Sequence, residues 1–207
     1  MSKKFKLLFA LISISLCLGL MSNTYSRYVA DASGDINLAF SKWQLLVNNT
    51  DITTSSSSNI EFTPVMEENA NVKNDTVAPS STGYFDINID PNNVEVSFIY
   101  TITLSVLNEN IPDLMITRYA ILPTDYIEGD PLDFITLTEN TISNELIFDN
   151  ETPDFSFNQI SIRIYFEWFE GDGELMDDES DTAVGNDATI NGTTLDLSAN
   201  IKFEQKL

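Results

Sequence analysis

The residues best suited to chemistry lie in one acidic segment that contains glycine, Glu170–Gly185. Hard divalent cations prefer carboxylate oxygens, and glycines allow a chain to fold back around an ion. The segment is therefore a candidate calcium-binding loop. The spacing does not match an EF-hand loop, so we favour a charged, solvated loop without metal and expect no cofactor, with calcium binding as the alternative. The candidate metal ligands are Asp172, Glu174, Asp177, Asp178 and Asp181.

Other kinds of active site are limited by composition. The chain has no histidine, and its only cysteine, Cys17, lies in an apolar stretch near the N-terminus. Without histidine the chain lacks the usual general base near neutral pH and the commonest metal ligand. Ser-His-Asp, Cys-His and histidine-zinc chemistry are thus excluded. We assign no catalytic residue and expect a non-enzyme. Glycoside hydrolysis by two carboxylates is the enzymatic alternative, although 32 acidic residues create such pairs by chance.

The charge balance narrows the range of partners. Ten basic residues against 32 acidic ones give a formal net charge of −22. Such a surface repels nucleic acid and anionic lipid. We therefore expect no nucleic-acid partner. The acidic surface is also consistent with a soluble extracellular protein.

The N-terminus has the pattern of a secretory leader. Met1–Lys6 is basic, Leu7–Leu20 is apolar, and Met21–Ser26 brings small polar residues. This order predicts a signal peptide over residues 1–26. The apolar stretch is shorter than the roughly 20 residues needed to span a bilayer, so we expect membrane contact only through the uncleaved leader. Residues 27–207 then form one domain.

The rest of the chain alternates apolar and polar residues with a period of two, which predicts β-strands. The longest run, Val94–Leu107, is expected to bend near Ile99 and to form a hairpin with Gly83–Asp90. No helical period of any length is present. We predict an all-β fold, a two-sheet antiparallel sandwich in the form of a jelly roll. The further expected strands are 35–47, 60–65, 114–122, 134–137, 145–148, 159–169 and 193–203.

Several features together resemble the TasA/camelysin group of secreted proteins from Gram-positive bacteria. The leader runs straight into a strand, Ser81–Ile87 reads Ser-Thr-Gly-Tyr-Phe-Asp-Ile, and Trp168 is followed by the acidic segment and by Asp181-Thr-x-x-Gly185. The resemblance implies a jelly-roll subunit of extracellular biofilm fibres, secreted to the matrix or cell surface after cleavage by a SipW-type signal peptidase. Camelysin is described as a metalloprotease, but without histidine that activity does not carry over to this chain.

The resemblance also implies self-association into filaments by donor-strand exchange. The N-terminal segment of about residues 25–39 would insert as a strand into the next subunit, because a released strand can cover a neighbour's open sheet edge. A calcium-dependent adhesin or a carbohydrate-binding β-sandwich module is the alternative function. The assembly residues expected in the donor strand are Tyr25, Tyr28, Val29, Ile36 and Leu38.

Overall fold

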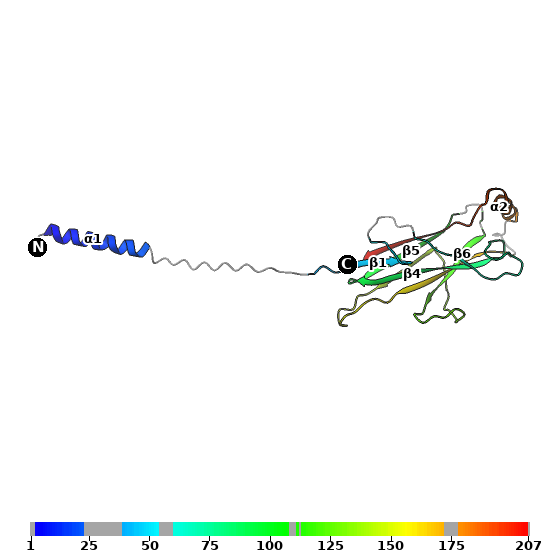
Figure 1. The fold of residues 1–207 in the computed structure, drawn as a ribbon, viewed down its shortest axis with the longest axis horizontal. Coiled ribbons are helices and arrows are strands. Elements are labelled where there is room, and N and C mark those ends of the chain that lie inside the picture. Colours follow the sequence, from blue (N-terminus) through cyan, green and yellow to red (C-terminus); the bar gives the residue numbers. More distant parts are fainter. Residues whose placement is uncertain are drawn as a thin grey trace. The chain divides into compact units, whose positions relative to one another are not determined.

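The computed structural model describes residues 3–22, 39–53, 60–107, 111, 113–171 and 178–206. The chain divides into two compact units, Met1–Ala39 and Phe40–Leu207 (Figure 1). The first contains helix α1 (Lys3–Ser22), within the region predicted as the leader. None of the described helices combines the length and apolarity needed to cross a membrane. The signal peptide and its boundary at residue 26 stay predictions.

The second unit contains two antiparallel sheets. The larger one has seven strands in the order β2-β1-β4-β9-β6-β7, with β3 paired to β4. The smaller one has three strands in the order β10-β5-β8. The large-sheet strands are β1 (Trp43–Val47), β2 (Thr50–Asp51), β3 (Val65–Met66), β4 (Thr82–Val94), β6 (Leu114–Leu122), β7 (Ile135–Thr136) and β9 (Ile160–Trp168). The small-sheet strands are β5 (Phe98–Val106), β8 (Thr141–Leu146) and β10 (Leu197–Gln205).

The core lies between these two sheets. Apolar side chains at alternate positions of β4, β5 and β9 form one buried cluster, as the period of two predicts. The predicted all-β two-sheet antiparallel sandwich is therefore confirmed. Its division into seven and three strands is unequal, whereas a regular jelly roll is built from eight strands in two Greek keys. The jelly-roll form stays a prediction.

The predicted hairpin between Gly83–Asp90 and Val94–Leu107 is wrong. β4 pairs with β1, β3 and β9, whereas β5 pairs with β10 and β8, so consecutive strands lie in opposite sheets. The long run is divided at 95–97 rather than bent near Ile99, because the chain crosses there from one sheet to the other. Ser97 fixes the crossing: its hydroxyl accepts a hydrogen bond from Phe148 N at 2.9 Å, and its carbonyl accepts one from Lys206 N at 2.9 Å.

The expectation of no helix is also wrong for the end of the acidic segment. Residues Asp178–Asn191 form helix α2, none of whose residues is buried. The helix lacks an apolar stripe, so periodicity gives no signal for it. Its first turn contains Asp178, Glu179 and Asp181, and acidic side chains there interact favourably with the positive end of the helix dipole.

Ile162 tests the dependence of the fold on the shared core. It is 0% exposed and lies in β9, between Ile87 of β4 and Ile121 of β6. Ile162→Ala should lower the free energy of unfolding by about 2–5 kcal/mol, because it leaves a cavity in a packed core. Ile190→Ala is the control, since Ile190 is 78% exposed on α2. Equal midpoints for the two variants in urea denaturation would contradict this account of the core.

Candidate assembly edge and acidic site

The edge strand β10 is the most extended open feature of the sandwich. It pairs with β5 through nine consecutive residue pairs, from Leu197↔Val106 to Gln205↔Phe98, and no described strand pairs with its other side. Figure 1 shows β10, in red, alongside β5. An uncovered edge of this kind presents unpaired backbone donors and acceptors to any strand that approaches it.

The ladder determines which residues of β10 face outward. Leu107 N donates to Asp196 O at 2.8 Å, and Lys206 N donates to Ser97 O at 2.9 Å. The even-numbered residues of the β10 segment therefore form the backbone hydrogen bonds to the β5 segment. In an antiparallel ladder the intervening residues turn their N–H and C=O groups away from that partner. The outward backbone groups therefore belong to the odd-numbered residues Leu197, Ala199, Ile201, Phe203 and Gln205.

The same odd-numbered positions also carry the apolar side chains of β10. Leu197, Ala199, Ile201 and Phe203 are partly buried and pack against the core cluster, yet no residue of β10 is fully buried. A strand added beside β10 would extend the small sheet and cover these side chains further. We call β10 with these four side chains the β10 edge.

The predicted assembly residues Tyr25, Tyr28, Val29, Ile36 and Leu38 lie outside the described residues. The nearest described apolar side chain that continues their pattern is Phe40, which is 96% exposed. Trp43 follows at the start of β1 and is 38% exposed, with its ring edge-on to Phe98 at 6.0 Å between centroids. The chain thus enters the sandwich with large apolar side chains incompletely covered.

Of the candidate metal ligands, Asp172, Glu174 and Asp177 lie outside the described residues. Asp178 and Asp181 belong to the first turn of α2. The indole Nε1 of Trp168 donates a hydrogen bond to Asp181 Oδ1 at 3.0 Å, which joins the end of β9 to this helix. Burial raises the pKa of Asp181, and so do the negative charges of Asp113, Glu170 and Asp178. The bond from Trp168 acts in the opposite direction.

Asp113 is the functional candidate that sequence reasoning missed. It directly precedes β6 and is 0% exposed, and neither of its carboxylate oxygens has a hydrogen-bond partner in the described part of the chain. Its backbone carbonyl accepts a bond from Phe169 N at 2.9 Å, which holds it beside the end of β9. We call Asp113 and Asp181, with Trp168, the acidic site. A sequence signal exists only in retrospect: an aspartate next to a strand that begins with buried Leu114.

The described residues do not form a complete metal centre. They include no group of three or more histidine, cysteine, aspartate or glutamate side chains placed to hold one ion. The acidic site therefore supplies two carboxylates, with Glu170 and Asp178 near enough to act on Asp181 electrostatically. The five-ligand calcium loop considered from sequence stays a hypothesis.

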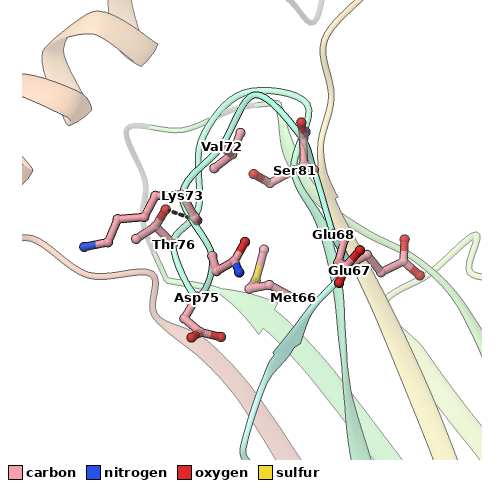
Figure 2. A pocket seen from close by; sticks show the side chains of 10 residues that line it. Met66, Glu67, Glu68, Val72, Lys73, Asp75, Thr76 and Ser81 are labelled. Atoms are coloured by element: carbon pink, nitrogen blue, oxygen red, sulfur yellow. Dashed lines mark hydrogen bonds between the residues drawn. The ribbon is translucent and has the colours of Figure 1, made fainter.

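A small hollow lies under the loop that connects β3 to β4 (Figure 2). Its volume of about 140 Å³ is well below the roughly 300–1,000 Å³ of typical small-molecule sites. The loop supports itself, since Asn69 Nδ2 donates to Ser80 O at 3.2 Å and Thr76 Oγ1 donates to Lys73 O at 2.6 Å. Its acidic and basic lining gives no arrangement of a nucleophile with a base.

The strongest polar cluster lies on the outer face of the large sheet, around Arg163. This side chain is 6% exposed, and its Nε and Nη2 donate to the two oxygens of Asp86 at 2.8 and 3.0 Å. Nη1 donates to Glu128 at 2.9 Å, and the guanidinium lies 3.9 Å from the ring centroid of Tyr84. Burial lowers the pKa of Arg163, but the bonds to Asp86 and Glu128 raise it by more. The guanidinium is thus a permanent cation that ties the 123–134 loop to β4 and β9.

This arginine cluster is structural, and its removal should be costly. Arg163→Met leaves the Asp86 carboxylate without its bidentate partner, so it should lower the free energy of unfolding by about 2–4 kcal/mol. This loss is smaller than the usual loss of about 3–5 kcal/mol on breaking a fully buried ion pair, because both carboxylates retain contact with water. Lys202→Met is the control: it removes the exposed pair with Glu204 and should change stability by less than about 1 kcal/mol. Chemical denaturation measures both, and a near-neutral Arg163→Met would refute a structural role.

No protein-family model matches the chain, and a search of the curated proteins gives no match. The TasA/camelysin resemblance thus stays a prediction, and the functional argument depends on the chain's own residues and geometry.

Proposed function

We propose that the chain is a non-enzymatic subunit of extracellular fibres, in which the N-terminal segment of one copy adds as a strand to the β10 edge of the next. The observation that carries the proposal is the β10 edge itself: nine residues in regular register with β5 and uncovered on the other side within the described structure. Strand addition supplies affinity through main-chain hydrogen bonds and specificity through alternate side chains.

The side chains of the two segments suit each other. The β10 edge offers four partly buried apolar side chains on one face. The proposed donor, residues 25–39, contains the alternating residues Ile36 and Leu38, and Phe40, which directly follows the donor, continues the alternation and is 96% exposed. In a donor strand whose every second residue is apolar, the apolar side chains can cover the core while the polar side chains of the same strand point toward water. Area removed from water on both sides then favours association, at roughly 25 cal/mol per Å².

The positions of donor and acceptor favour filaments over closed dimers. The donor segment precedes β1 in the large sheet, whereas the acceptor is an edge of the small sheet. Two different surfaces therefore meet at each contact, which makes the contact heterologous. A heterologous contact whose rotation does not close propagates as an open chain of subunits.

The leader and the family resemblance supply the cellular setting of the proposal. The predicted secretory leader would place assembly outside the cell, and cleavage by a SipW-type signal peptidase would free the donor segment. The biofilm matrix or the cell surface of a Gram-positive bacterium is the corresponding location. The acidic surface, with a net charge of −22, suits a protein that does not bind nucleic acid.

Blocking one outward backbone donor tests the proposal. The N–H of Ala199 points away from β5, so Ala199→Pro removes it without removing a ladder bond, and proline is tolerated at such edges. The full chain with its leader is expressed in Gram-positive cells, and fibres are counted by electron microscopy. We expect at least about a tenfold loss of fibres. The variant loses one hydrogen bond worth about 0.5–1.5 kcal/mol, and the proline ring also clashes sterically with the donor strand.

Two further variants make the result decisive. Ala199→Ser keeps the N–H and should assemble like wild type, and deletion of Tyr25–Ala39 should abolish fibres. Thermal unfolding of the monomeric Ala199→Pro variant tests whether the variant is folded. Undiminished fibres from the deletion variant would refute donor-strand assembly, and a stable wild-type monomer that binds glycans tightly would favour the carbohydrate-binding alternative.

A further inference from the structure

We propose that Asp113 and Asp181 form a binding site for a calcium ion at the end of the sandwich where β6 begins, β9 ends and α2 begins. The proposal differs from the candidate calcium loop identified from sequence because its central ligand, Asp113, lies far from that loop in the chain. It is independent of strand exchange.

The first argument is the state of Asp113. Its side chain is 0% exposed, and both carboxylate oxygens lack a hydrogen-bond partner among the described residues. A buried carboxylate that is neither hydrogen-bonded nor paired with a charge is strongly disfavoured. Natural proteins resolve this by pairing the charge, by coordinating a metal or by protonating the group.

The second argument is that none of the described cationic side chains of the sandwich forms an ion pair with Asp113. Arg163 binds Asp86 and Glu128, and Arg118 lies over the rings of Phe134 and Tyr165. Three lysines form their own ion pairs, and the fourth lines the hollow under the β3–β4 loop. These pairs are Lys42 with Glu95, Lys202 with Glu204 and Lys206 with Glu145. No described side chain is thus assigned to neutralise Asp113.

The third argument is the convergence of negative charge. Asp181 Oδ1 accepts a hydrogen bond from Trp168 Nε1 at 3.0 Å, and Asp113 lies near enough for its negative charge to act on Asp181. Glu170 and Asp178 add to the same field. Like charges gathered in a partly buried place destabilise the fold unless a cation joins them. A bound cation would turn this repulsion into a link between two strands and a helix.

The ligand chemistry selects the cation. The two side chains offer only hard oxygen atoms, and the chain has no histidine and no cysteine outside its N-terminal apolar stretch. Zinc and copper prefer nitrogen and sulfur ligands. Calcium accepts carboxylates together with backbone carbonyls and water in a flexible shell, which a site at the meeting of three elements can supply.

Calcium titration of chelator-treated full chain tests the site. The Trp43→Phe background leaves Trp168 as the only tryptophan, so its fluorescence reports on the hydrogen bond to Asp181. We expect saturable fluorescence change and, at calcium near 100 times Kd, a rise in Tm of about 5–10 °C. Asp113→Asn and Asp181→Asn should each abolish both effects. Asp133→Asn, which removes an exposed carboxylate, should retain them.

The alternative is that no cation binds at Asp113. In that case calcium changes neither Tm nor fluorescence, and the proposal is overturned. It is also overturned if Asp113→Asn responds to calcium as the wild type does. In calcium-free buffer Asp113→Asn should melt at or above the wild-type Tm, because an uncompensated charge has been removed. If Asp113→Asn folds poorly with calcium present, its Tm in calcium-free buffer and the calcium response of Asp181→Asn still test the proposal.

Discussion

The structure depends on one constraint: two sheets of unequal size must bury their apolar faces against each other. The inward residues of β4, β5 and β9 meet in one cluster, and Phe98, Ile102, Ile162 and Ile164 are each 0% exposed. The chain has no cysteine outside its N-terminal stretch, so no disulfide holds the sandwich. Apolar burial and the backbone ladders therefore carry its stability, and the charged groups described above lie on the outer face, at the edges and at the ends. Both functional proposals belong to those places.

The same constraint explains which parts of the fold can be predicted from sequence. The 114–122 strand and most of the 159–169 strand follow from alternation, because inward residues must be apolar whatever their neighbours are. Alternation does not say to which sheet a strand belongs. Val94, Val96 and Phe98 keep one phase through the crossing at 95–97, since both sheets face the same core, and the sequence therefore suggests one long strand with a hairpin partner. Ser97, which anchors the crossing through three-dimensional contacts, carries no local signal.

The candidate site shows a similar division. Acidic density identifies the segment around Asp181, because many carboxylates close together are visible in one dimension. Asp113 is a single aspartate more than sixty residues earlier, and only the pairing of β6 with β9 brings it beside Trp168. Its importance comes from complete burial without a partner, a property that no residue type or spacing encodes. The helix that holds Asp181 was missed for a related reason: α2 buries no residue, so its sequence lacks an apolar period.

The β10–β5 ladder has a consequence for how the molecule is made. Phe98 pairs with Gln205 and Val106 with Leu197, so the small sheet joins segments separated by about half of the chain. Contacts between such distant segments form slowly, because a long loop must close before the ladder stabilises it. During synthesis β5 must wait for β10, the last of the described strands in chain order. The edge proposed to receive a neighbour is therefore completed after the other described strands, which would keep an incomplete chain from joining a neighbour before its own core is closed.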